Sequence, residues 1–148
     1  SSLVAGGAAV PSLNSLDRET LRQPPTYVPN RNMMLLSMAA AFAEAQGMEA
    51  VYYGAQAQDE YGYWDCTKDF LERLNRVFAL NRRNAVRVEA PFIVWPKSET
   101  VRLGLELGVD FCMTWSCYRG EGRPCGECTT CVERHNAFVT VGAIDPLA

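Results

Sequence analysis

The sequence contains no apolar run that approaches the roughly 20 residues a helix needs to cross a bilayer. Its longest apolar stretch, residues 33–45, is interrupted by Ser37 and Glu44 and predicts a buried helix instead. The N-terminal residues also lack the pattern of a signal peptide. We therefore expect a cytoplasmic protein with no membrane partner.

The sequence has little lysine, only two residues, and its net charge is −3. A negative balance argues against a general electrostatic attraction to nucleic acid. The twelve arginines favour planar recognition of phosphate or carboxylate groups, or reflect a GC-rich genome. A length of 148 residues with 48% hydrophobic composition suits one globular domain with a real core.

Four cysteines lie close together near the C-terminus, at intervals of eight, three and three residues. Four thiolates at such intervals can close on one tetrahedral ion, with Zn–S bonds of about 2.3 Å. Gly126 relieves backbone crowding between the second and third ligands. Because four sulfurs leave no open coordination position, this pattern predicts a structural zinc rather than a catalytic one. The ligands would be Cys117, Cys125, Cys128 and Cys131.

Other uses of these cysteines are less well supported by the sequence. Disulfides suit small secreted scaffolds, whereas this chain has helical apolar patterns. A redox Cys-x-x-Cys pair would leave two sulfurs unexplained, and an iron–sulfur cluster remains chemically open. Cys66 and Cys112 lie outside the cluster, and we expect both to be ordinary buried thiols.

The periodicity of the chain predicts four helices and two strands in alternation, which is typical of parallel βαβ units in an α/β fold. A parallel sheet of only two strands would not stand alone, so further strands are expected, N-terminal to those seen here. The expected elements are an irregular arm over residues 1–26, a helix capped by Asn32 and running to Gln46, a strand over 50–56, a helix capped by Thr67 and running to Leu80, a strand over 86–92, a helix capped by Ser98 and running to Leu107, and a last helix from Thr129 or Thr130 to about Gly142.

The turn before the first helix brings Arg31 and Asn32 to its N-terminus. Unsatisfied N–H groups beside a guanidinium form a plausible site for phosphate or another anion. The alternative is that Asn32 only caps the helix while Arg31 is solvated.

Two further candidate groups follow predicted strands. Asp59 and Asp65 lie on the loop after the first strand, at the edge where open α/β sheets bind ligands, with Tyr61, Tyr63 and Trp64 nearby to stack on a planar ring. The alternative is an aromatic loop with two solvated carboxylates. Lys97 lies at the mouth of the helix after the second strand, where it either reinforces an anion site or lies on the surface. His135, the single histidine, is expected to be a surface or packing residue of the last helix rather than a metal ligand or general base.

These segments together resemble the 7-cyano-7-deazaguanine synthase family of the PP-loop ATP pyrophosphatase superfamily. The resemblance runs from about Thr26 to Leu147. It rests on Tyr-Val-Pro-Asn-Arg-Asn, Gly-Tyr-x-Asp-Cys, Lys-Ser-Glu-Thr-Val-Arg-Leu-Gly and Thr-Trp-Ser-Cys-Tyr-Arg-Gly followed by Cys-Gly-x-Cys-x-x-Cys. It implies that residues 27–148 are the C-terminal part of a partial Rossmann-like domain of the adenine nucleotide alpha hydrolase type, with a zinc-binding subregion over 115–142.

The resemblance implies an ATP-dependent ligase that makes 7-cyano-7-deazaguanine from 7-carboxy-7-deazaguanine and ammonia. It also implies ATP with Mg²⁺, a structural zinc on the four cysteines, and a homodimer. Lys97, Asp59 and Asp65 would take catalytic roles, and Arg31 and Asn32 would bind the nucleotide.

Two departures from the family pattern concern completeness. The Ser-Gly-Gly-x-Asp-Ser loop that cradles ATP phosphates is not found, because Gly6-Gly7 is followed by Ala-Ala-Val. The usual Gly-Tyr-Pro-Asp-Cys-Arg reads Gly-Tyr-Trp-Asp-Cys-Thr here. We therefore expect catalysis to require a separate ATP-binding segment. The alternatives are a non-catalytic zinc-stabilised binding module, or a relative from a DNA-modification or phage-defence system that acts on another acceptor.

Overall fold

A computed structural model describes residues 1–15, 23–57, 59, 62–120 and 122–148. The chain divides into two compact units, one formed by residues 28–94 and the other by residues 1–27 together with 95–148. The predicted arm, residues 1–26, therefore belongs to the unit that carries the cysteines. Within the described ranges, no helix combines the length and apolarity needed to span a bilayer.

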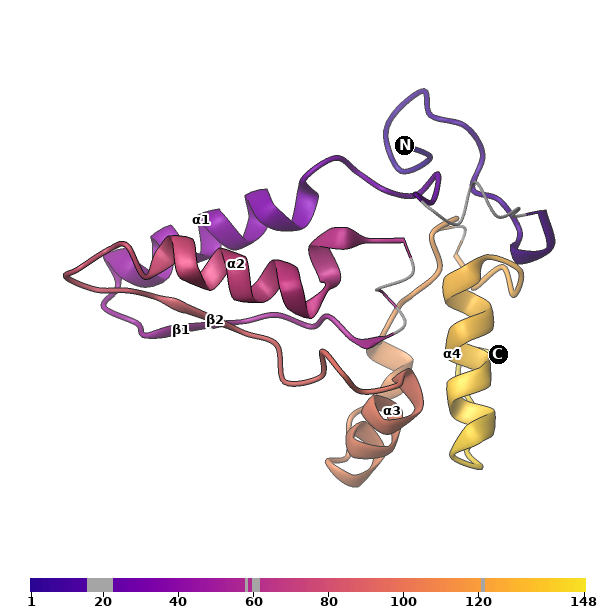
Figure 1. Ribbon diagram of the computed structural model, residues 1–148. Coiled ribbons are helices and arrows are strands. Elements are labelled where there is room, and N and C mark those ends of the chain that lie inside the picture. Colours follow the sequence, from indigo (N-terminus) through magenta and orange to yellow (C-terminus); the bar gives the residue numbers. More distant parts are fainter. Residues whose placement is uncertain (16–22, 58, 60–61, 121) are drawn as a thin grey trace. The chain divides into compact units, whose positions relative to one another are not determined.

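The unit 28–94 is built on a parallel pair of strands, β1 (Ala50–Tyr52) and β2 (Arg87–Glu89), aligned with Val51 opposite Val88. Helices α1 (Arg31–Ala45) and α2 (Lys68–Phe78) pack on this pair (Figure 1). The predicted α/β class with parallel strands is confirmed.

Both strands are shorter than expected. The predicted strands covered residues 50–56 and 86–92, but pairing continues past β1 only through the N–H of Tyr53, which donates to Glu89 at 2.8 Å. Pro91 has no N–H to donate to a ladder, and its position explains why β2 ends at Glu89.

The core of this unit lies between the helices and the strands, where Leu36, Phe70, Leu74 and Val88 form one buried cluster. The prediction that the first helix is buried all round is wrong, because only one side of α1 packs within its unit. An apolar stripe on α1 is exposed among the described residues, and its members are Met34, Leu35, Met38 and Phe42.

Helix starts test the capping predictions. Thr67 caps α2 as expected, since its hydroxyl accepts from the N–H of Phe70 at 3.1 Å. The prediction that Asn32 caps the first helix is wrong, because α1 begins at Arg31 and Asn30 is the cap residue. Asn30 has a φ of 55°, a left-handed conformation that asparagine tolerates better than most residues.

The third helix, α3 (Lys97–Glu106), also begins earlier than predicted. Ser98 was expected to cap it, but Pro96 in extended conformation holds that position and Ser98 lies in the first turn. This correction makes Lys97 the first residue of α3.

The unit that carries the cysteines is built from α3 and α4 (Thr129–Thr140), which pack through Val101, Ala137 and Phe138. The ring of Phe111 meets that of Phe138 edge to face, with centroids 5.1 Å apart. Gly104 permits this packing, because a Cβ at residue 104 would lie 2.6 Å from the Phe111 ring.

Cys112 is exposed, contrary to the prediction that it is buried. It lies in the short turn η4 (Phe111–Met113), where Phe111 takes the inward position. Cys66 is buried as expected.

We predict that Gly104→Ala destabilises this unit although alanine favours helices. The overlap with Phe111 should cost about 1–3 kcal/mol, the usual range for overpacked cores, against a gain of about 1 kcal/mol in helix propensity. Thermal and urea unfolding would measure the difference. Glu106→Ala, at an exposed position of the same helix, is the control, and a Gly104→Ala protein as stable as the control would contradict the prediction.

Candidate functional site

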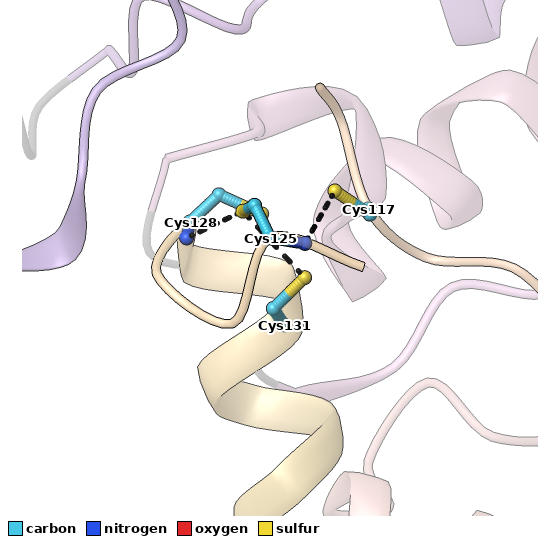
Figure 2. Close-up of side chains that lie close together, drawn as sticks. All are labelled: Cys117, Cys125, Cys128 and Cys131. Atoms are coloured by element: carbon cyan, nitrogen blue, oxygen red, sulfur yellow. Dashed lines mark hydrogen bonds between the residues drawn. The ribbon is translucent and has the colours of Figure 1, made fainter. Parts of the chain in front are cut away.

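The four cysteines predicted from spacing converge on one point. Their sulfur atoms all lie within 4.8 Å of one another, and Cys125 Sγ is 3.9 Å from Cys131 Sγ. Four Zn–S bonds of about 2.3 Å in a tetrahedron place sulfurs about 3.8 Å apart, so the set fits one ion. Figure 2 shows two of these side chains on the start of α4 and two on the loop before it. The chain thus forms a four-cysteine metal site.

The backbone of the loop holds the sulfurs in place through its own N–H groups. The N–H of Cys125 donates to Cys117 Sγ, and the N–H of Cys128 donates to Cys125 Sγ, both at 3.4 Å. Gly126 stands between these ligands with a φ of 74°, a left-handed conformation that most residues avoid. The turn therefore points two sulfurs inward before α4 begins at its N-cap, Cys128.

Side chains of neighbouring residues fix the two ends of this loop. Thr130 Oγ1 donates to the carbonyl of Ser116 at 2.7 Å and lies 3.3 Å from Cys128 Sγ. Trp115 Nε1 donates to the carbonyl of Cys117 at 2.9 Å. The first ligand is thereby tied to the helix that carries the last two.

Local hydrogen bonds bias two of these thiols toward the thiolate that binds metals. Burial alone would raise the pKa of Cys128, but its contact with the Thr130 hydroxyl and hydrogen bonds from the N–H groups of Tyr118 and Cys131 lower it to about 6. The pKa of Cys117 is also lowered, because backbone N–H groups outweigh its burial. Cys131 behaves oppositely, since burial and the nearby sulfurs raise its pKa to about 12. A bound cation would offset the repulsion between neighbouring thiolates and so allow Cys131 to lose its proton as well.

The same geometry argues against the other uses of the cysteines. A disulfide needs an S–S distance of about 2.05 Å, which is far below the 3.9 Å observed between Cys125 and Cys131. An iron–sulfur cluster spreads its four cysteines over two or four irons and would set some of the sulfurs farther apart.

The N-terminal arm lies against the metal loop. Val10 packs against the buried cysteines, and the N–H of Leu13 donates to the carbonyl of Glu127 at 3.0 Å. Arg119 joins both segments, because it pairs with the Glu127 carboxylate at 3.0 Å and reaches the carbonyl of Val10 at 3.5 Å. Part of the arm is thus a cover for the site rather than a free linker.

A buried ion pair anchors the other side of α4, and the sequence alone did not reveal it. Arg134 binds both carboxylate oxygens of Asp145, at 2.7 and 2.8 Å, and their side chains are 9% and 7% exposed. The guanidinium also donates to Thr114 Oγ1 at 2.7 Å and to the carbonyl of Phe111 at 3.2 Å. The signal in the sequence was an arginine three residues after Cys131 and an Asp-Pro turn at the C-terminus.

The unit 28–94 brings together a second group of predicted residues. Asn32 and Asp65 meet there, because the N–H of Asn32 donates to Asp65 Oδ2 at 3.3 Å. Asp65 is 1% exposed, and its Oδ1 has no hydrogen-bond partner within the described ranges. The predicted anion site at the start of α1 therefore already contains a carboxylate at this N–H.

Cys66 and Tyr53 complete this polar cluster. Tyr53 Oη donates to the carbonyl of Asp65 at 2.8 Å and lies 3.1 Å from Cys66 Sγ, which also accepts from Asn32 Nδ2 at 3.3 Å. Burial raises the pKa of the Cys66 thiol to about 11 and that of Tyr53 further above its usual range. Cys66 is thus a neutral thiol near pH 7 and is not suited to act as a nucleophile.

Of the remaining predicted residues, Asp59 lies close enough to this cluster for its charge to help raise the pKa of Tyr53 and of Cys66. Asp59 Oδ2 accepts from the N–H of Gln56 at 3.1 Å on the loop after β1. Tyr61 lies outside the described residues. Lys97 belongs to the other unit, where its Nζ is 2.7 Å from Glu133 Oε2. His135 is exposed on α4, as expected.

Comparison with known proteins gives consistent matches. Residues 1–142 match the family described as Queuosine biosynthesis protein QueC. The chain is 45% identical to the 7-cyano-7-deazaguanine synthase of Caldicellulosiruptor bescii, over 86% of this chain and 57% of that protein. It is 49% identical to the synthase of the same name from Archaeoglobus fulgidus, over 82% of this chain and 52% of that protein. It is 41% identical to that of Nostoc punctiforme, over 99% of this chain and 68% of that protein.

These matches confirm the resemblance seen in the motifs. The chain spans somewhat more than half the length of most of these curated relatives.

We predict that Cys128→Ser removes the metal from this site. A site with three sulfurs forfeits much of the binding energy that folds the loop, so metal content should fall at least tenfold and Tm by roughly 10 °C. Elemental analysis and circular dichroism would measure both. Cys112→Ser, an exposed cysteine outside the cluster, is the control. Retention of one ion per chain in Cys128→Ser would contradict the four-sulfur site.

We also predict that Asp145→Asn destabilises the protein by about 3–5 kcal/mol at pH 7, because it leaves Arg134 buried without its counter-ion. Arg134 holds the pKa of Asp145 below its usual 3.8, so this stabilisation is present above about pH 4 and is lost as the pH falls through the lower folded value. Urea unfolding of both proteins between pH 3 and 7 should show the difference shrinking in acid.

The control for this pair is Asp69→Asn, which breaks an Arg–Asp pair of the same chemistry on the surface, where the side chains are 73% and 70% exposed. It should change stability little. Equal effects of the two substitutions would show that burial of the Arg134 pair contributes nothing.

Proposed function

Because the chain belongs to the QueC family of queuosine biosynthesis proteins, we propose that it contributes to an ATP-dependent synthase that converts 7-carboxy-7-deazaguanine and ammonia to 7-cyano-7-deazaguanine. The observation that carries the proposal is 45% identity to a synthase of this name across 86% of the chain. The family match over residues 1–142 includes the metal loop and both loops that follow strands.

The reaction needs two activations, because neither a carboxylate nor an amide gives up its oxygen readily. A carboxylate oxygen attacks the α-phosphorus of ATP and pyrophosphate leaves. Ammonia then attacks the carbonyl carbon, and AMP departs with the carbon–oxygen bonding electrons, which yields the amide. The amide oxygen attacks the α-phosphorus of a second ATP and pyrophosphate leaves. Cleavage of the carbon–oxygen bond then releases AMP, and loss of two protons from nitrogen leaves the nitrile.

Positive charge near the phosphates would stabilise both steps, since charge develops on the leaving group. Arg31 and Lys97 are our candidates for that role, and both lie in the first turn of a helix, where N–H groups add partial positive charge. Asp59 and Asp65 follow β1 and are our candidates for holding the amine or the metal-bound nucleotide. Asp65 Oδ1 supports this assignment, because this buried oxygen has no hydrogen-bond partner among the described residues and calls for a donor or a cation.

We propose zinc as the ion of the four-cysteine site, with a structural role. Four thiolates in a compact tetrahedral set suit zinc, and they leave no position for a water or substrate. Elemental analysis of the purified protein should give one zinc per chain. Iron in its place would overturn this assignment.

A second candidate function is a zinc-stabilised binding module that does not turn substrate over. The four-cysteine site is compatible with it, because four sulfurs on one ion leave no position for a substrate. The two functions separate in one assay, in which the chain and a full-length protein that carries it are each given ATP, ammonia and 7-carboxy-7-deazaguanine. Nitrile formation, followed by mass spectrometry, supports the synthase. Binding of the substrate without product from either protein supports the module.

We predict that Lys97→Ala in the active full-length protein lowers kcat about 100-fold, because charge stabilisation of the transition state is lost. Product formation measured by mass spectrometry checks it. The chain offers a matched control in its other lysine, since Lys68→Ala removes an exposed residue of α2. Equal activity of both variants would remove Lys97 from the catalytic machinery.

A further inference from the structure

The contact between Lys97 and Glu133 is unlike the other lysine contact in the chain. Lys97 Nζ lies 2.7 Å from Glu133 Oε2, and the two side chains are 19% and 37% exposed. Lys68 and Glu72 are 3.9 Å apart and more than half exposed. The first pair links residues 36 positions apart on two helices, whereas the second is a local contact within α2.

Glu133 occupies a firmly held position on α4. Cys131 lies two residues before it and is a ligand of the metal site. Arg134 follows it directly and is locked to Asp145 by two hydrogen bonds. The helix at Glu133 is therefore held by the metal loop on one side and by a buried ion pair on the other.

The partner helix is fixed relative to α4 by a shared core. Val101 of α3 packs with Ala137 and Phe138 of α4, close to the aromatic pair that Gly104 accommodates. Lys97 begins α3, so the two charged groups come from rigid elements whose spacing is set by apolar packing. Because both helices are held in place, the contact with Glu133 restricts the side chain of Lys97.

We propose that Glu133 is a positioning residue that holds the ammonium group of Lys97 in the orientation required for the reaction. The proposal rests on the role assigned to Lys97 in the proposed function. A lysine side chain has four rotatable bonds and loses much rotamer freedom when it is fixed. The charge-assisted hydrogen bond to Glu133 restricts this freedom and uses one of the three N–H donors of the ammonium group.

Protein kinases use the same device on an unrelated fold, where a Lys–Glu ion pair must form before the lysine serves the nucleotide phosphates. Here the glutamate comes from the helix whose first turn carries two metal ligands. The metal site would thus act on the chemistry indirectly, by fixing α4 and with it Glu133.

The test uses the full-length protein with Glu133→Gln, Glu133→Asp and the control Glu72→Gln, which removes the partner of the other lysine. We expect Glu133→Gln to lower kcat at least tenfold while metal content, Tm and the KM for 7-carboxy-7-deazaguanine stay near wild type, because misplacing a reacting group by about 1 Å can cost 100-fold. Glu133→Asp should restore part of the activity, and Glu72→Gln should behave as wild type.

Several outcomes would overturn the proposal. A kcat of Glu133→Gln within twofold of wild type, while Lys97→Ala is inactive, refutes positioning but leaves the proposed function intact. Loss of the metal or of stability in Glu133→Gln shows a merely structural role. An inactive wild-type protein, or an active Lys97→Ala, removes the proposed function of Lys97 and this inference with it.

A second measurement needs no activity. The chain has two lysines, so limited amine modification followed by peptide mass spectrometry reports Lys97 with Lys68 as an internal reference. Lys97 should react more slowly than Lys68. Glu133→Gln should raise the Lys97 rate relative to the Lys68 rate severalfold, because the ion pair between Lys97 and Glu133 is lost. Glu72→Gln should leave the rate of Lys97 unchanged. An unaltered ratio in Glu133→Gln would show that Glu133 does not restrain the lysine.

Discussion

Four sulfur atoms held within 4.8 Å of one another are the constraint on which the unit that carries them depends. Thiolates at this spacing repel one another, and burial makes each of them costly to charge. A divalent cation offsets both effects, so metal binding and folding of the loop become one process. The hydrogen bonds from Cys125 and Cys128 N–H groups prepare the arrangement but do not supply the missing charge.

Helix α4 carries that constraint into the rest of the unit. Its first turn holds Cys131, its middle holds the buried Arg134, and its inner side packs on α3 through Phe138. The metal loop, the Arg134 ion pair and the apolar packing thus hold α4 at different positions along its length. Glu133 lies among them, so the position of Lys97 on α3 follows from how well α4 is held.

The unit 28–94 poses a different problem, which is how to satisfy the N–H groups at the start of α1. The side chain of the cap residue Asn30 makes no capping hydrogen bond to the helix, and Asp65 supplies a carboxylate to the N–H of Asn32 instead. A negative group at a helix N-terminus is favoured by the helix dipole. The same carboxylate retains a buried oxygen without a partner in the described part of the chain, which is how a residue can serve both the fold and a ligand.

Local features of this protein were readable from the sequence alone. Cysteine spacing identified the metal ligands, helical and strand periodicity gave the order of α1 to α4, and Thr67 identified the start of α2. These signals act between residues close in the chain. The exposed face of α1, the pairing of Arg134 with Asp145 and the contact of Lys97 with Glu133 depended on tertiary structure, because periodicity reports that a face is apolar or charged but not what packs against it. The predictions that Asn32 and Ser98 cap their helices were wrong for a related reason. The left-handed backbone of Asn30 and the extended backbone of Pro96 decide where α1 and α3 begin.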